Sequence, residues 1–334
     1  MILVTGGTGL VGSHLLYQLS LTKDKIRAIY RSEDKIKLTK RVFSYYTKDD
    51  AFFNKIEWLK ADVTNVSSLE KAFKNINLVY HCAAIVSFDA RDYQQMRKVN
   101  IEGTANMVNF ALANNVTKFC FVSSIATIEK NTSNNLITET NEWNTETNNY
   151  GYAITKYGAE MEVWRATQEG LDVVIVNPGV ILGSGFWYNG PGELFTKFYT
   201  EFKFYTEGIT GFVGVKDVVK TMILLMDGSI KNERFILVAE NSSFKDVFFK
   251  IADSFHKKRP NIKVDKTLSN IAWRLEKIKS FITQKPPLIT KHSASASLSK
   301  YQYSSAKIEK TLNFSFEELE DTIIAVCKDF LKDK

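Results

Sequence analysis

The sequence contains few cysteines and prolines and no long apolar run. Its three cysteines are an odd number, and two of them, Cys82 and Cys120, lie inside apolar strand-like runs, so we expect them and Cys327 to be reduced thiols. Reduced thiols are typical of a reducing compartment, and the chain opens on a strand rather than a signal peptide, so we expect a cytoplasmic protein. No apolar stretch approaches the length that spans a bilayer, so we expect no stable membrane insertion.

Low-complexity sequence and concentrated charge are also lacking. Five prolines and the absence of Gly/Ser-rich tracts leave no flexible linker. The formal charge is +7, but the lysines are scattered along the chain, so we expect no nucleic-acid partner. We also expect no metal site. With 334 residues, 44% of them hydrophobic, the chain can form one large domain and a smaller lobe.

The strongest motif is a glycine turn at the start of the chain. An apolar strand at 1–5 is followed by Gly6, Gly9 and Gly12, in Gly-x-x-Gly-x-x-Gly spacing, and then by a helix pattern. Gly6 would allow the tight turn, Gly9 would leave no Cβ where a pyrophosphate approaches, and Gly12 would let the helix pack closely on the sheet. Free N–H groups and the positive end of the helix dipole would face the phosphates. The motif therefore predicts a dinucleotide site.

Apolar runs alternate with helical patterns through the first half of the chain. The expected strands lie near residues 1–5, 26–30, 56–60, 77–82, 118–123 and 172–177. This βαβ progression predicts an α/β fold, a Rossmann doubly wound parallel sheet with a smaller α/β C-terminal substrate lobe. We place the dinucleotide-binding domain at residues 1–180, with 212–238 returning to it. The substrate lobe is then formed by 181–211 and 239–334.

A tyrosine and a lysine one helical turn apart form the second motif. Tyr152 and Lys156 share one helix face, and a cation beside a phenol favours the phenolate and lowers its pKa. Ser124 follows a buried strand upstream of them, where its hydroxyl can hydrogen-bond a substrate oxygen beside the phenol. These three residues predict a proton-handling site.

Two further segments lie in the second half of the chain. Glycine and aromatic residues crowd 183–215, and six of the aromatic residues are expected to line an apolar pocket: Phe186, Trp187, Tyr188, Phe195, Phe198 and Tyr199. A helix predicted near 268–282 has one apolar face, formed by Leu268, Ile271, Leu275, Ile278 and Phe281 or Ile282. We expect this face to point to the core or to serve as a lid, with contact to a membrane surface as the alternative.

These motifs resemble the extended short-chain dehydrogenase/reductases of the epimerase/dehydratase group, and most of all their dihydroflavonol-reductase-like subgroup. The resemblance covers nearly the whole chain. It implies that the cofactor is contacted by the loop residues Thr5, Gly6, Thr8, Gly9, Leu10, Val11 and Gly12. It also implies that Asp62 and Val63 contact the adenine, and that Cys82, Ala83 and Ala84 lie near the ribose and pyrophosphate. Val122 would contact the cofactor as well, and Pro178, Gly179 and Val180 would lie near the nicotinamide.

The resemblance also implies a role for each residue of the second motif. Lys156 would bind the nicotinamide ribose and lower the pKa of Tyr152, Tyr152 would exchange the substrate proton, and Ser124 would orient the reacting oxygen. Asn100 matches an asparagine of the family that lies on a helix. It would either join a catalytic relay or only bend its helix and hold a water.

Arg31 bears on the choice of cofactor. At the end of the second strand an acidic residue would bind a free ribose hydroxyl, whereas an arginine suits a 2′-phosphate. Here the strand closes on Arg31, and no carboxylate comes before Glu33. We therefore favour NADP(H), with NAD(H) as the alternative, in which Arg31 is simply solvated or stacks on the adenine.

Three functions stay open at this point. The first is a reductase that acts on an apolar or ring-bearing carbonyl. The second is a nucleotide-sugar epimerase, although such an enzyme needs cations for a diphosphate and the only arginines beyond residue 180 are Arg234, Arg259 and Arg274. The third is an NAD(P)-binding sensor without turnover. The resemblance also implies a homodimer formed through the helices near 92–113 and 150–168.

Overall fold

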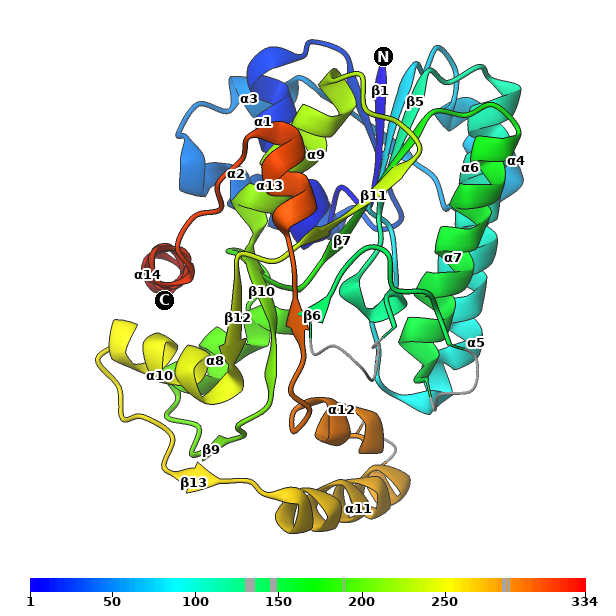
Figure 1. The fold of residues 1–334 in the computed structure, drawn as a ribbon. Coiled ribbons are helices and arrows are strands. Elements are labelled where there is room, and N and C mark those ends of the chain that lie inside the picture. The colour runs from blue at the N-terminus through cyan, green and yellow to red at the C-terminus, as the bar shows by residue number, and fades with distance from the viewer. Residues whose placement is uncertain (130–135, 145–148, 189, 284–286, 288) are drawn as a thin grey trace.

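A seven-stranded parallel sheet forms the centre of the computed structural model, which describes residues 1–334 except 130–135, 145–148, 189, 284–286 and 288 (Figure 1). Its strand order is β11-β7-β5-β4-β1-β2-β3. The strands are β1 (Ile2–Thr5), β2 (Ile26–Tyr30), β3 (Ile56–Lys60), β4 (Leu78–His81), β5 (Lys118–Val122), β7 (Val173–Pro178) and β11 (Glu233–Leu237). The predicted doubly wound α/β fold is confirmed.

Helices cover both faces of this sheet (Figure 1). One face carries α1 (Leu10–Thr22), α2 (Asp34–Tyr46), α3 (Ala51–Asn54), α9 (Val215–Asp227) and α13 (Ala306–Leu312), and the other carries α4 (Val66–Ala72), α6 (Gly103–Ala113) and α7 (Gly151–Gln168). Side chains alternate between the faces along each strand, so Ile2 and Val4 pack in one core and Leu3 in the other. Because both faces are covered, the central strands β1 and β7 are buried along their whole length.

A continuous helical stretch leads into α6. It contains a 3-10 turn at Ala90–Asp92, α5 (Tyr93–Met96) and a π-helical segment at Arg97–Glu102. Other short 3-10 turns lie at Ile125–Thr127, immediately after β5, and at Gly190–Gly192.

The smaller lobe is built on a three-stranded sheet of β8 (Val180–Leu182), β10 (Ile209–Gly214) and β12 (Glu240–Ser243). Three helices pack with it: α8 (Glu193–Tyr199), α10 (Phe244–Ser254) and α14 (Leu319–Lys332). Between β10 and β12 the chain returns to the large sheet through α9 and β11. The domain limits given above stay a prediction. The structure adds that β10 pairs within the smaller sheet.

The aromatic residues of the 183–215 region form the core of this lobe. Trp187, Phe195 and Phe198 are at most 4% exposed, and the Trp187 ring lies 5.0 Å from the ring of Phe330 on α14. The prediction that these three residues line a pocket was wrong. A lobe with only three short strands needs bulky rings to fill its interior, and these residues supply them.

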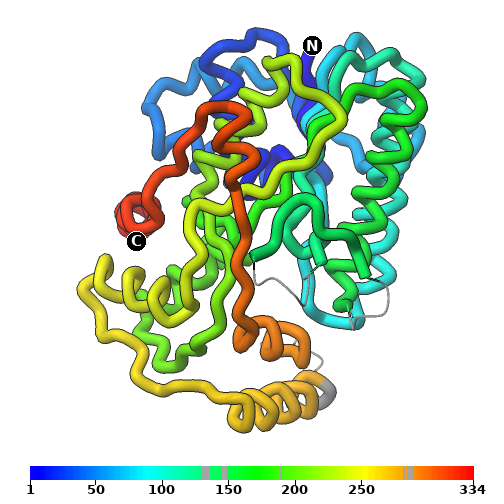
Figure 2. The backbone as a smooth tube through the Cα atoms, viewed as in Figure 1, coloured from blue at the N-terminus to red at the C-terminus, as the bar shows by residue number. Residues whose placement is uncertain are grey.

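The C-terminal part of the chain runs beneath both lobes before it returns to the large sheet (Figure 2). It contains β13 (Ile262–Lys263), which pairs with β9 (Phe204–Tyr205), then α11 (Lys266–Thr283) and α12 (Lys291–Ala296). Next comes β14 (Gln302–Tyr303), which pairs with β6 (Leu136–Ile137). Within the described ranges, no helix has both the length and the apolar character needed to cross a membrane.

Candidate active site

The glycine turn lies between β1 and α1, at the carboxyl edge of the large sheet. Gly6 has a φ of +68°, and a Cβ there would lie 2.7 Å from the backbone nitrogen of Ala83, so conformation and space both require glycine. A Cβ on Gly12 would lie 2.2 Å from the Gly6 oxygen. Gly12 therefore allows the helix to pack on the turn itself, rather than on the sheet as predicted.

The outer side of the turn suits an anion. Among the described residues other than its chain neighbours, only the Gly6 oxygen would come within 4 Å of a Cβ on Gly9, at 3.4 Å. Gly9 caps α1 without a side-chain hydrogen bond, and the first turn of the helix, which begins with Leu10 and Val11, carries no acidic residue. The backbone N–H groups and the positive end of the helix dipole are thus not neutralised by side chains, as a diphosphate site requires.

The end of β4 is fixed to this turn. Oγ1 of Thr5 lies 2.6 Å from Nδ1 of His81 and accepts a hydrogen bond from the backbone N–H of Ala83 at 3.2 Å. His81 is fully buried, and burial lowers its pKa to about 3, so its imidazole is neutral. Burial also raises the pKa of the Cys82 thiol to about 12, which makes it a poor nucleophile. The structure therefore brings two of the predicted residues, Cys82 and Ala83, beside the glycine turn, and Ala84 follows them in the chain.

Arg31, Asp62 and Val63 come together at the ends of β2 and β3. Nη1 of Arg31 lies 3.9 Å from Oδ2 of Asp62, and 53% of the Arg31 side chain is exposed. That separation is too long for a hydrogen bond, so the guanidinium stays accessible. Oδ1 of Asp62 accepts hydrogen bonds from the backbone and hydroxyl of Thr64, both at 2.8 Å. Val63 is buried against α6, where Gly103 leaves room for it.

Ser124, Tyr152 and Lys156 meet where β5 ends and α7 begins. Tyr152 lies in the first turn of α7, and its phenol is close enough to the Ser124 side chain for that neighbour to affect its pKa. Lys156 lies one turn later, where its Nζ donates to the Val122 oxygen at 2.7 Å and is 4.2 Å from the centre of the Phe121 ring. The structure thus joins all three predicted residues, together with Val122.

The electrostatics of this group differ from the expectation. Burial raises the pKa of Tyr152 to about 12, and the neighbouring Ser124 side chain offsets this only in part. Burial also lowers the pKa of Lys156 to about 7, partly offset by the charge of Glu160. The pKa of the phenol therefore lies above its usual value and not below it, because the low-dielectric surroundings penalise the phenolate.

Asn100 ties the loop after β4 to α7. It lies in the π-helical segment and is buried. Its Oδ1 accepts from the Ile85 backbone N–H at 2.8 Å, and its Nδ2 donates to the Ile85 oxygen at 3.0 Å and to Oγ1 of Thr155 at 3.1 Å. Both ends of the amide are thus used, which favours the structural interpretation of this residue over a proton relay.

Pro178, Gly179 and Val180 lie at the junction of the two lobes. The Gly179 N–H donates to the Leu237 oxygen of β11 at 3.0 Å, and a Cβ on Gly179 would lie 2.3 Å from the Gly211 oxygen. Val180 begins β8 and pairs with Phe212 of β10. Only a glycine allows three strands to approach so closely here.

A buried carboxylate beyond Lys156 escaped the sequence analysis. Glu160 is fully buried on α7, one helical turn after Lys156. Its Oε2 accepts from Ser123 at 2.5 Å, Thr127 at 2.8 Å and Asn177 at 3.0 Å, and its Oε1 pairs with Arg234 at 3.1 Å. Because Nδ2 of Asn177 also donates to the Ser124 oxygen, this cluster holds the backbone of the candidate serine. The four-residue spacing from Lys156 was the available signal.

Aromatic side chains from distant segments gather around Tyr150, whose ring is a neighbour of Tyr152. The Tyr150 ring lies 6.1 Å from that of Tyr152, 5.3 Å from Phe88 in the loop after β4, and 6.1 Å from His292 on α12. No local pattern relates these positions in the sequence, so this aromatic cluster of Phe88, Tyr150 and His292 was missed.

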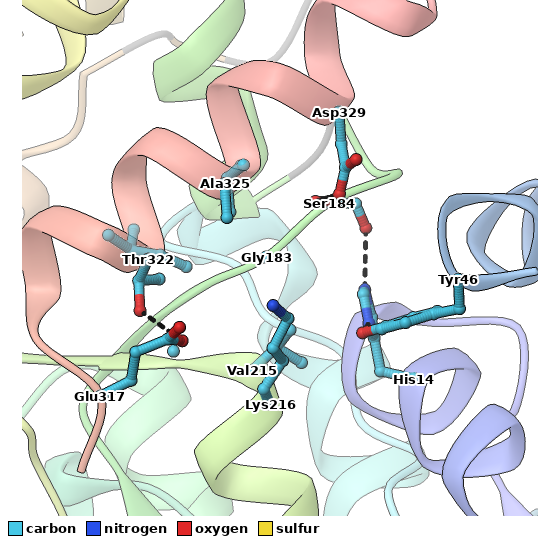
Figure 3. Close-up of a pocket in the computed structure, with 13 residues that line it drawn as sticks. His14, Tyr46, Gly183, Ser184, Val215, Lys216, Glu317, Thr322, Ala325 and Asp329 are labelled. Atoms are coloured by element: carbon cyan, nitrogen blue, oxygen red, sulfur yellow. Dashed lines mark hydrogen bonds between the residues drawn. The ribbon is translucent and has the colours of Figure 1, made fainter.

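A separate pocket lies at the seam between the lobes, lined by residues of α1, α2, α9 and α14 (Figure 3). Nδ1 of His14 lies 2.6 Å from the Tyr46 hydroxyl, and its Nε2 lies 3.0 Å from the Ser184 oxygen. Burial lowers the pKa of His14 to about 4, so a neutral histidine joins the lobes here. In the parts of the chain that the structure describes, no three His, Cys, Asp or Glu side chains gather as a metal site would require.

Comparisons with known proteins point to one family. A family model of NAD-binding proteins, described as male sterility protein, matches residues 4–231. The chain is similar to sterol demethylase protein B of Methylococcus capsulatus, with 25% identity over 299 residues that cover 87% of this chain and 86% of the relative. It is also similar to a putative dihydroflavonol 4-reductase of Synechocystis, with 26% identity over 252 residues that cover 73% and 69%.

The solved structures include a similar fold over the full length. The crystal structure of gox2253 superposes with a TM-score of 0.81 at 25% identity, covering 100% of this chain and 98% of that one. The match extends over both lobes.

Proposed function

Because this chain belongs to the male sterility family of NAD-binding proteins, within the extended short-chain dehydrogenase/reductases, we propose that Ser124, Tyr152 and Lys156 form its catalytic site. The chain is an NAD(P)-dependent enzyme of the oxidoreductase type. The observation that carries the residue assignment is that Tyr152 lies beside Ser124, with the buried Lys156 one turn further along the same helix.

The pKa of Tyr152 favours carbonyl reduction as the direction of the reaction. With a pKa of about 12 the phenol keeps its proton at neutral pH, so it can donate that proton to a substrate carbonyl oxygen. Ser124 would hydrogen-bond the same oxygen and orient it. The nicotinamide cofactor, when bound, supplies the hydride. Lys156 would hold the ribose hydroxyls with its ammonium group.

The glycine turn and Arg31 would hold the rest of the cofactor. The open face over Gly9 and the uncapped start of α1 fit a diphosphate. We propose NADP(H) as the preferred cofactor, because the exposed guanidinium of Arg31 lies at the end of β2, where it can bind a 2′-phosphate. The carboxylate of Asp62 lies nearby, but it is not hydrogen-bonded to this guanidinium.

We propose an apolar or ring-bearing carbonyl as the substrate. The aromatic cluster of Phe88, Tyr150 and His292 supports this, since its Tyr150 ring lies beside that of Tyr152 and aromatic faces bind rings and hydrocarbon surfaces. The apolar substrate was first inferred from aromatic residues of the smaller lobe, such as Trp187 and Phe195, but these lie in its core. The aromatic cluster now supports the inference in their place.

Two further properties belong to this proposal. The free cysteines Cys82, Cys120 and Cys327 support a cytoplasmic location.

The exposed side chains of Ile154 and Met161, which lie on the outer side of α7, support a homodimer through this helix.

The proposed function can be tested by following NADPH and NADH absorbance with the purified protein and a panel of aldehydes, ketones and UDP-sugars. We expect carbonyl-dependent loss of NADPH, faster than that of NADH. Interconversion of a UDP-sugar without net cofactor oxidation would contradict the proposal in favour of an epimerase. Saturable cofactor binding without turnover on any substrate would instead indicate a sensor.

A further inference from the structure

Helix α11 lies on the protein with its polar side inward and its apolar side outward. Four apolar residues share one face, Leu268, Ile271, Leu275 and Ile278, and they are 38%, 50%, 60% and 58% exposed. On the opposite face Ser269 and Ser280 are only 5% and 7% exposed. The prediction that the apolar face points to the core was therefore wrong. The side chains of Phe281 and Ile282 lie outside the described part of the structure.

Polar contacts hold the helix in this orientation. Oγ of Ser280 accepts a hydrogen bond from Nη2 of Arg91 at 3.1 Å, and Arg91 is itself paired with Asp89 at 2.7 Å. Within the helix, the side chain of Glu276 is only 19% exposed and pairs with Lys279 at 3.0 Å, so this carboxylate lies on the inward side without itself attaching the helix. The inward face thus fixes the helix to the loop after β4, and the apolar face takes no part in this attachment.

Cations border the apolar face. At 3.6 residues per turn, Arg274 falls at one border of the apolar row and Lys279 at the other. Lys266 and Lys277 are also exposed, whereas the one acidic residue of α11, Glu276, faces inward. An apolar row flanked by cations matches a surface with an apolar interior and anionic head groups.

The exposed apolar surface continues beyond the helix. Ile262 of β13 pairs with Phe204 of β9 and precedes α11 by four residues, and these two side chains are 37% and 41% exposed. Figure 1 shows the β9–β13 pair and α11 along the same lower edge of the molecule.

We propose that α11, together with the β9–β13 pair, docks on an anionic membrane surface. The apolar row would enter the boundary between head groups and acyl chains while Arg274 and Lys279 contact lipid phosphates or carboxylates. Arg274 and the exposed Lys277 carry positive charge on the same helix, so a second copy would bring like charges together, and this disfavours a symmetric dimer through α11. The attachment is peripheral, because α11 is not apolar enough to cross a membrane.

The docked face adjoins the candidate active site. The C-terminal end of α11 contacts the loop after β4 through Arg91, and α12 follows it and carries His292 of the aromatic cluster. A substrate dissolved in the membrane would therefore enter close to Tyr152. The docking itself does not depend on the reaction proposed for Tyr152, and its test needs no substrate.

Flotation of the full chain with vesicles tests this proposal. We expect the protein to float with phosphatidylcholine vesicles that contain about one-third phosphatidylserine, and to float less with pure phosphatidylcholine or at high salt. The double variant Ile271→Ser/Leu275→Ser should lose about tenfold or more of its partitioning. The matched control is Ile324→Ser/Leu331→Ser on α14, where the two side chains are 50% and 49% exposed, and it should float like the parent.

Thermal unfolding and cofactor binding of each variant establish that it is folded. Failure of the parent to float with anionic vesicles would overturn the proposal. Equal flotation of the parent and the Ile271/Leu275 variant would also overturn it. A third result would also overturn the proposal: light scattering shows that the parent is a dimer and that the Ile271/Leu275 variant is a monomer. In that case a second copy of the chain, and not a membrane, would cover α11.

Discussion

The buried carboxylate of Glu160 gives the sharpest test of how the site is held together. Removing its side chain in Glu160→Ala leaves the donors of Ser123, Thr127 and Asn177, and the Arg234 guanidinium, without their shared acceptor. Glu160 is fully buried, so water cannot replace the lost oxygens without a rearrangement. Breaking a buried ion pair by removing one partner costs about 3–5 kcal/mol. We expect a loss of that size in the free energy of unfolding, out of about 5–15 kcal/mol for a typical protein.

Glu162→Ala is the matched control on the same helix. Glu162 pairs with Arg165 at 3.0 Å, and both side chains are partly exposed, so its loss should cost about 0–1 kcal/mol. Urea unfolding followed by circular dichroism measures both variants. A change of less than about 1 kcal/mol for Glu160→Ala, or an equal loss for Glu162→Ala, would refute the reasoning.

Glu160→Gln tests whether the carboxylate also acts on Lys156. The charge of Glu160 raises the pKa of Lys156, which burial lowers to about 7. Without that charge the pKa of Lys156 should fall further, because the ammonium loses a favourable neighbour. A limb of the pH profile of kcat/KM that reports Lys156 should therefore move to lower pH, whereas a purely structural role would leave its position unchanged.

Two further predictions concern the cofactor and the seam between the lobes. Arg31→Asp should shift the cofactor preference toward NAD(H), measured as the ratio of the two dissociation constants, and an unchanged ratio would show that the phosphate is held elsewhere. His14 has a folded-state pKa of about 4, below the usual 6.5, so the unfolded chain binds its proton more readily between these values. The free energy of unfolding should therefore fall by up to about 3 kcal/mol as the pH drops from 6.5 to 4. His81, whose pKa burial lowers to about 3, adds a dependence of the same sign. His14→Gln should therefore make the dependence less steep without removing it, measured by urea unfolding at each pH, and an equally steep dependence in the variant would contradict the assignment.

The large sheet and its edge could be predicted because the signals are local. Parallel strands that are buried on both faces read as continuous apolar runs, and Gly6 must adopt a positive φ immediately after β1. Ser124 lies two residues after β5, at the carboxyl edge of the sheet, and Tyr152 and Lys156 lie one helical turn apart, so each of these signals could be found locally.

The remaining features depend on contacts between distant segments. Trp187 and Phe195 fill the interior of the smaller lobe because α10 and α14 pack on them, and α14 lies more than a hundred residues away in the sequence. The apolar pattern of α11 is plain in the sequence, but its orientation is set by Ser280 and Arg91, which no local pattern connects. His292 likewise contacts Tyr150 because the C-terminal part of the chain runs beneath the site, and no local pattern connects these two residues.

Replacement of Tyr152 by phenylalanine tests the central claim most directly. Tyr152→Phe removes one oxygen and keeps the ring, so the aromatic contact with Tyr150 should persist. We expect cofactor affinity, measured by titration of NADPH fluorescence, to stay within about twofold of the parent, while kcat for carbonyl reduction falls at least about a hundredfold. Retention of most of the activity in this variant would contradict the account.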